Sequence, residues 1–138
     1  MKLGTIRFRL AVSLLMVAGF MIRVPLMAHH GNNAYDTSKP VVWKQVTITK
    51  YLWSNPHVII LFDAKDTKGQ IQHWTAEAGT PQTLVLSGWD KSSIRAGDIV
   101  TVYVYQSKTG NPVGRLNRIV LADGTELKDS ALGYDKSP

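Results

Sequence analysis

The chain has 138 residues, of which 44% are hydrophobic, so it has room for one domain with a packed core and is too apolar for a disordered chain. Cysteine is absent, which excludes disulfides, zinc–thiolate sites and cysteine nucleophiles. The formal charge of +6 comes largely from residues 1–28, which hold four Lys or Arg and no acidic residue. The other 110 residues carry 12 bases and 10 acids, a balance that argues against nucleic acid as a partner.

Residues 1–28 have the layout of a secretory signal peptide. Three basic residues come first, an apolar run of 13 residues follows at Leu10–Ile22, and Ala28 offers a small side chain for cleavage. This run is shorter than the ~20 residues that a membrane-spanning helix needs. The alternative is an uncleaved anchor, which would place Arg23 inside the bilayer. We therefore expect a bacterial periplasmic or secreted protein, cleaved near Ala28, with no stable membrane span after cleavage.

Beyond a polar, irregular arm at residues 29–40, five segments have the β-branched and aromatic composition of strands. They are residues 41–53, 57–64, 70–77, 99–106 and 115–122. In the first segment the alternation places Val46, Ile48, Lys50 and Leu52 on one face, and Thr47, Thr49, Tyr51 and Trp53 on the other. In the fourth, Val100, Val102 and Val104 form the expected inward row. Residues 125–127 are a candidate for a short further strand.

One short helix is predicted between the third and fourth strands. Thr80 can cap it, Pro81 suits its first position, and Gly88 can end it. Residues 84–86 provide its apolar stripe. The order of three strands, a helix and two strands is that of a five-stranded Greek-key barrel, the OB-fold, with the helix closing one end. We expect an all-β fold with one short helix, a single OB-fold-like domain at residues 29–127, and a flexible tail at residues 128–138. A small β-sandwich is the alternative.

Short motifs in a fixed order resemble a known family. They are His29-His30-Gly31, Lys39-Pro40, Trp53-Ser54-Asn55-Pro56-His57, Trp74, Glu77, Gly79-Thr80-Pro81, Ser87-Gly88-Trp89 and Ala96-Gly97-Asp98. Together they resemble the small exported bacterial proteins grouped as domain of unknown function 6152, and the likeness covers most of residues 28–127. The resemblance implies export, a small β-barrel and a mature start near the two histidines. It implies no particular activity.

The predicted cleavage makes His29 the first residue of the mature chain. Its α-amine would then have a pKa of roughly 7.7–8.0, close enough to neutral for a metal ion to displace the proton. The amine and the imidazole of His29 can chelate one ion, and His30 adds a second imidazole. Such nitrogen donors suit Cu(II). The alternative is a polar start that binds metal only as any histidine-containing peptide does.

His57 is the candidate to complete such a site. Counting back from the loop at residues 65–69, with Ala64 opposite Gln70, a regular hairpin places His57 beside Glu77. A carboxylate there would fix the tautomer of the imidazole, and the pair would serve as metal ligand and support, as an acid–base pair or as a structural contact. His73 is expected to be a partly exposed histidine without a special role.

Aromatic side chains are the second candidate binding feature. Tyr51 and Trp53 are expected on one strand face, next to the Ser54-Asn55-Pro56 turn, and Trp74 and Trp89 are further candidates for a ligand pocket. OB-folds bind oligosaccharides and oligonucleotides over such faces, and an exported protein favours a glycan or peptide. The alternative is that most of these side chains fill the core.

No enzyme signature is present: the chain lacks Gly-x-Ser-x-Gly, a phosphate-binding glycine-rich loop and HExxH. We therefore expect a non-enzymatic exported protein that binds a small ligand, a metal ion or an envelope protein. The leading hypothesis is a divalent metal such as Cu(II) at His29 and His30, with His57 as a further ligand and Glu77 as its support. The alternatives are a glycan- or peptide-binding module and an accessory subunit of an envelope complex, which would use the arm and an exposed strand edge.

Overall fold

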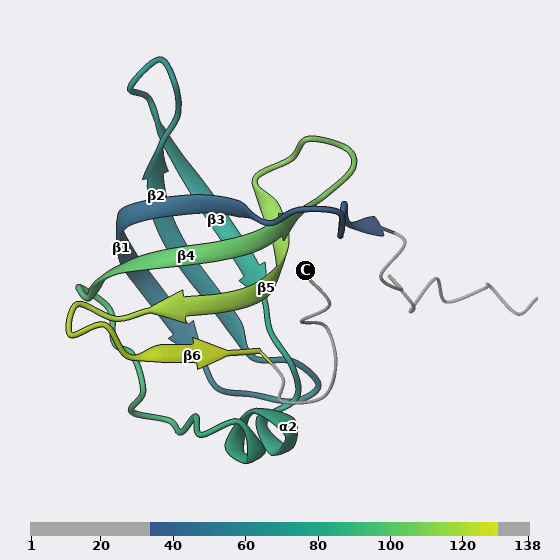
Figure 1. Cartoon of the computed structure of the whole chain (residues 1–138), viewed down its shortest axis with the longest axis vertical. Coiled ribbons are helices and arrows are strands. Elements are labelled where there is room, and N and C mark those ends of the chain that lie inside the picture. The colour runs from purple at the N-terminus through teal and green to yellow at the C-terminus, as the bar shows by residue number, and fades with distance from the viewer. Residues whose placement is uncertain (1–33, 130–138) are drawn as a thin grey trace, which may run out of the picture. The chain divides into compact units, whose positions relative to one another are not determined.

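The computed structural model of the chain describes residues 34–129, so the predicted leader, His29, His30 and residues 130–138 lie outside the described residues. The element order is the predicted one (Figure 1). Its members are β1 (Val41–Leu52), β2 (Ile59–Lys65), β3 (Ile71–Glu77), α2 (Pro81–Leu86), β4 (Ile99–Gln106), β5 (Val113–Val120) and β6 (Glu126–Lys128). The short strand expected at residues 125–127 is β6. Three boundaries differ from the prediction by two residues, because β2 begins at Ile59 and β5 runs from Val113 to Val120.

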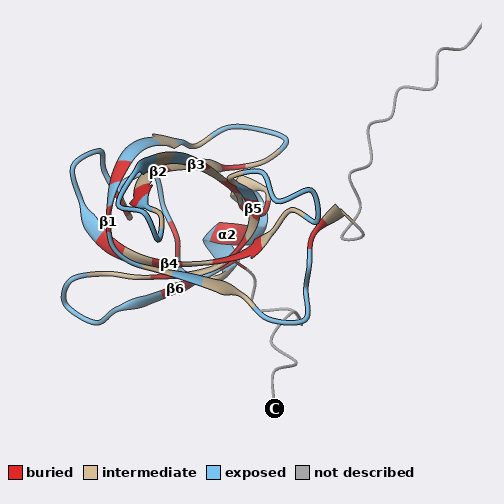
Figure 2. Cartoon of the chain, turned by 90° about the horizontal axis from the view of Figure 1, so that it is seen from above, coloured by how far each residue is buried: buried red, intermediate tan, exposed pale blue. Residues whose placement is uncertain are grey.

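The strands form one sheet in the order β3-β2-β1-β4-β5-β6, and β3 also pairs with β5. That extra pairing closes the first five strands into a ring, which is visible when the molecule is viewed from above (Figure 2). All the pairings are antiparallel except β3 with β5, where Thr75, Ala76 and Glu77 lie opposite Val113, Gly114 and Arg115. The prediction of an all-β fold with one short helix and a closed five-stranded, OB-fold-like barrel is confirmed.

Alternating residues of the strands fill the barrel. The predicted inward row on β4 is confirmed, since Val100, Val102 and Val104 are 3% exposed or less. Val46 and Ile48 of β1 face the same interior. The largest fully buried side chains are Trp74, Trp89, Phe62, Ile48, Ile60, Leu84, Ile94, Leu116 and Ile119. Burial of these side chains supplies the main driving force for folding.

The predicted faces of β1 are wrong in its second half. The pairing of β1 with β2 shifts by one residue between Ile48 and Lys50, so Thr49 is an extra residue of the bulge type. Beyond the bulge, Tyr51 lies opposite buried Ile60 and packs with Trp53 against the core, while Leu52 faces outward. The change of face follows from the period of two along a strand, because one inserted residue moves every later side chain to the other side.

The helix α2 begins and ends where the sequence predicts. The Thr80 hydroxyl accepts a hydrogen bond from the Thr83 N–H at 3.2 Å, and Pro81 takes the first helical position. Gly88 follows the helix with a φ of +86°, which favours glycine. Of the expected apolar stripe only Leu84 is buried, and Leu86 is 75% exposed. The helix lies at one end of the barrel, inside the ring in the view from above (Figure 2).

Both ends of the described chain are attached to the barrel. In the arm, the Lys108 N–H donates to the Ala34 carbonyl at 3.0 Å and the Asp36 N–H donates to the Gln106 carbonyl at 2.9 Å. Tyr35 between them is only 8% exposed. At the other end, β6 extends through Lys128, the residue at which the tail was predicted to begin, and Asp129 is buried. Within residues 34–129, no helix has the length and apolar character that crossing a bilayer requires.

The backbones of β4 and β5 lie very close together at Gly114. A Cβ added there would lie 3.0 Å from the Tyr105 carbonyl oxygen and 3.0 Å from the Val104 Cβ. We predict that Gly114→Ala lowers the free energy of unfolding by about 1–3 kcal/mol, because backbone atoms of β4 and β5 must separate. Asn111→Ala, an exposed change in the adjoining loop, is the control and costs about 0.5 kcal/mol or less. Urea unfolding measures both, and equal stability of the two variants would contradict the close approach.

Candidate functional site

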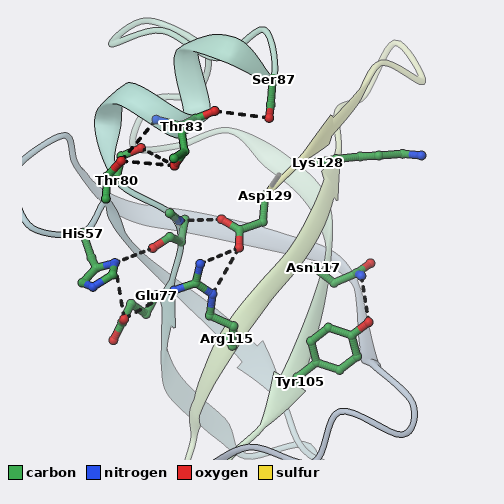
Figure 3. A network of polar contacts seen from close by, with 12 residues as sticks. His57, Glu77, Thr80, Thr83, Ser87, Tyr105, Arg115, Asn117, Lys128 and Asp129 are labelled. Atoms are coloured by element: carbon green, nitrogen blue, oxygen red, sulfur yellow. Dashed lines mark hydrogen bonds and ion pairs between the residues drawn. The ribbon is translucent and has the colours of Figure 1, made fainter. Parts of the chain in front are cut away.

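The polar side chains that the fold brings together lie on the outside of the barrel, where β3 meets β5. Because Glu77 and Arg115 are opposite each other in the parallel pairing, their side chains leave the sheet on the same side. His57 and Asp129 lie around them (Figure 3). Tyr35 is close enough to feel the charges of Glu77 and Arg115, and we call these five residues the seam cluster.

Arg115 joins the two carboxylates of the cluster. Its Nη2 and Nε donate to Oδ2 of Asp129 at 2.8 and 3.1 Å, and its Nη1 lies 3.5 Å from Oε1 of Glu77 (Figure 3). The other carboxylate oxygen of Asp129 accepts the Gly79 N–H at 2.5 Å. Both oxygens of this buried carboxylate are therefore satisfied, and the contact ties the end of β6 to the segment between β3 and α2.

His57 is held by one of its two ring nitrogens. Its Nδ1 lies 3.1 Å from the Ala78 carbonyl oxygen and 3.5 Å from Oε1 of Glu77. A carbonyl oxygen only accepts hydrogen bonds, so Nδ1 carries the proton and the neutral ring has its lone pair on Nε2. In Figure 3 the dashed lines reach only one of the two ring nitrogens of His57. With a side chain that is 40% exposed, His57 can offer Nε2 to a ligand or a metal ion.

His57 and Glu77 meet by a route that differs from the prediction. In the β2–β3 hairpin Ala64 lies opposite Gln72 instead of Gln70, so the predicted register is wrong by two residues. The residue opposite Glu77 is Ile59. His57 precedes the start of β2, and its side chain reaches Glu77 from there.

The charges of the seam cluster favour a cation. With both carboxylates ionised and His57 neutral, Glu77 and Asp129 outweigh the single charge of Arg115. Burial raises the pKa of the Tyr35 phenol, Glu77 raises it further, and Arg115 partly offsets them, so this group stays neutral. Burial likewise raises the pKa of Asp129, against the lowering effects of Arg115 and the Gly79 N–H.

The cluster does not form a complete metal site by itself. Among residues 34–129, no group of three or more His, Asp or Glu side chains is arranged to hold a metal ion. His29 and His30, the leading ligands expected from the sequence, lie outside this range. Of the predicted metal ligands the structure therefore describes His57 alone, together with its support Glu77.

The aromatic residues divide between the core and the surface. Trp74 and Trp89 are each 2% exposed, and the indole N–H of Trp89 donates to the Lys128 carbonyl at 2.7 Å. Tyr51 and Trp53 are half-buried, with their rings 5.9 Å apart in an edge-to-face arrangement. The Tyr51 hydroxyl donates to the Asp90 carbonyl at 2.9 Å. Of the predicted aromatic pocket, Tyr51 and Trp53 are thus the part that remains accessible, beside the exposed Asn55.

His73 has a partner that the sequence did not suggest. It lies opposite Asp63 in the hairpin, and its Nδ1 is 2.6 Å from a carboxylate oxygen of Asp63. The side chain of His73 is 83% exposed. This pair lies on the outer face of β2 and β3, and His73 therefore serves below as a control for His57.

Sequence reasoning missed Tyr35, Arg115 and Asp129. Each carries an ordinary residue type in a segment without a motif, and Asp129 lay in the predicted tail. Their proximity depends on the parallel pairing of β3 with β5, which joins segments almost forty residues apart. No pattern within a single strand reports such a pairing.

Comparison with known proteins gives a family and no activity. The model of a family of unknown function (DUF6152) matches residues 18–117. No curated protein and no solved structure matches the chain.

The ion pair at the centre of the cluster has a measurable effect on stability. We predict that Asp129→Ala lowers the free energy of unfolding by about 3 kcal/mol, because it leaves the Arg115 guanidinium and the Gly79 N–H without their acceptor. Glu126→Ala, which removes an exposed partner of Arg118, is the control and costs about 0.5 kcal/mol or less. Thermal and urea unfolding of both variants measure the difference, and a small effect at Asp129 would contradict the buried pair.

Proposed function

The chain belongs to the DUF6152 family, and we propose that it is an exported bacterial binding protein without catalytic activity, which binds a divalent metal ion such as Cu(II) through its mature N-terminus. The signal-peptide layout of residues 1–28 supports export, and cleavage after Ala28 would expose His29 as the first residue. The proposed ligands are the α-amine and imidazole of His29, the imidazole of His30 and Nε2 of His57.

The N-terminal residues supply the chelating part of this site. The amine of His29 loses its proton on binding, and the amine and imidazole of the same residue hold one ion between them. Nitrogen donors of this kind bind Cu(II) more tightly than the other common divalent ions of the first transition row. Because the amine must be deprotonated, affinity rises with pH through the titration of that group.

The single observation that carries the proposal is the arrangement of His57. The Ala78 carbonyl and Glu77 hold Nδ1, so Nε2 is turned outward with its lone pair. Histidines that bind metals commonly have this support, in which the second nitrogen donates to a carbonyl or carboxylate and fixes the tautomer and the ring. The excess negative charge of Glu77 and Asp129 over Arg115 favours a cation at the same place.

A glycan or peptide is the second candidate ligand, and one observation favours it. Tyr51 and Trp53 lie edge-to-face and half-buried at the barrel surface, next to the exposed turn of Asn55. Such a pair offers an apolar surface with little loss of side-chain freedom on binding. This candidate predicts a change in tryptophan fluorescence with a glycan or peptide in the absence of metal, and Trp53→Ala would abolish that change.

The test of the metal proposal is a titration of Cu(II) into protein that begins at His29, beside the same protein with its α-amine acetylated. We expect acetylation to weaken binding by at least about tenfold, because it removes the amine from the ligand set and leaves both imidazoles in place. Equal and weak binding by the two forms would contradict a terminal chelate.

A second pair of variants tests the role of His57. His57→Gln is expected to weaken Cu(II) binding by about tenfold or more, since it removes one nitrogen donor from the set. His73→Gln is the matched control, because His73 also sits beside a carboxylate, and it is expected to leave the affinity unchanged. Equal affinities of the two variants would remove His57 from the site and leave the N-terminal chelate alone.

A further inference from the structure

A cavity beside the arm suggests a second binding site that is independent of the histidines. The cavity has a volume of about 490 Å³ and lies between the arm, the end of β4 and the loop that follows β4. Its lining residues are Asp36, Lys39, Val41, Gln106, Ser107, Lys108 and Gly110. A volume of this size is typical of sites for small organic molecules, and the mouth of a β-barrel is a common place for them.

The charges of this cavity favour an anion. Lys39 and Lys108 supply two ammonium groups, and Asp36 supplies one carboxylate. The Asp36 carboxylate accepts hydrogen bonds from the Ser38 hydroxyl at 2.6 Å and from the Ser38 N–H at 3.1 Å. These bonds lower the pKa of Asp36, so it stays charged and directed to Ser38, and one positive charge remains in excess.

Two indole groups of the core have unused hydrogen-bond donors, and one of them, Trp43, is two residues from Val41, which lines the cavity. Val41 lines the cavity, and Trp43 follows two residues later on the same, core-facing side of β1. The ring of Trp43 lies 5.1 Å from that of Trp74, which is 2% exposed. The indole N–H groups of both are buried and have no hydrogen-bond partner among residues 34–129. A buried donor without an acceptor is unfavourable, so a turn of Trp43 toward an acceptor in the cavity gains a bond and breaks none.

We propose that this cavity binds a small organic acid. Its carboxylate accepts hydrogen bonds from the Lys39 and Lys108 ammonium groups and from the indole N–H of Trp43. Its apolar part packs on Val41 and on the Trp43 ring. A neutral molecule of the same shape lacks the attraction to the two lysines.

The test uses benzoate as the probe and benzamide as its neutral counterpart, with ¹H–¹⁵N spectra that resolve the indole N–H signals. We expect benzoate to shift the Trp43 signal in a saturable manner and benzamide to bind at least about tenfold more weakly. In Lys39→Gln/Lys108→Gln the affinity for benzoate should fall by about tenfold or more.

The control variant is Lys65→Gln/Lys68→Gln, which makes the same change in charge on two exposed lysines at the β2–β3 hairpin. It is expected to bind benzoate as the unchanged protein does. Equal losses in the two double variants would show that net charge alone attracts benzoate and would overturn the proposal. The absence of any shift at Trp43 with saturating benzoate would also overturn it.

Discussion

Three residue pairs between β3 and β5 hold the barrel closed, and they bring Arg115 to the Glu77 side chain of the β2–β3 hairpin. They place Glu77 beside Arg115 on the outer side of the sheet. Arg115 then binds Asp129, and Asp129 in turn accepts the Gly79 N–H just after β3. The polar contacts and the strand pairing thus join the same two segments. Because a parallel pair this short adds little by itself, we attribute the stability of the closure to the pairing and the buried ion pair together.

The open end of the β2–β3 hairpin explains how a part-exposed histidine keeps a defined orientation. Ala78 follows β3 directly, and its carbonyl fixes Nδ1 of His57, while its N–H donates to the Val58 carbonyl at 2.8 Å. The Val58 N–H donates to the Gly79 carbonyl, so the segments on either side of His57 and Ala78 are held by two backbone bonds. His57 is therefore positioned by main-chain structure, which depends little on neighbouring side chains.

Much of the fold could be predicted from the sequence because its signals are local. Alternation along β4 predicts the inward row of Val100, Val102 and Val104, and Thr80, Pro81 and Gly88 mark the ends of the helix. The bulge at Thr49 was missed, although Lys50 breaks the apolar row of Val46, Ile48 and Leu52 directly after it. Its consequence is large, because it packs Tyr51 and Trp53 against the core, which they share with Val46 and Ile48 and not with Leu52. The candidate site was only partly predictable: His57 and Glu77 are close in the hairpin, whereas Arg115 and Asp129 reach them through the barrel closure.

Our central claim is that the Ala78 carbonyl and Glu77 of the seam cluster fix His57 with its proton on Nδ1 and its lone pair on Nε2. A long-range ¹H–¹⁵N spectrum of the imidazole groups in metal-free protein at mildly alkaline pH measures this directly. We predict a protonated-type shift for Nδ1 and an unprotonated-type shift for Nε2 of His57. The opposite pattern, with the proton on Nε2, would contradict the hydrogen bond to Ala78 and leave no lone pair directed outward for a ligand.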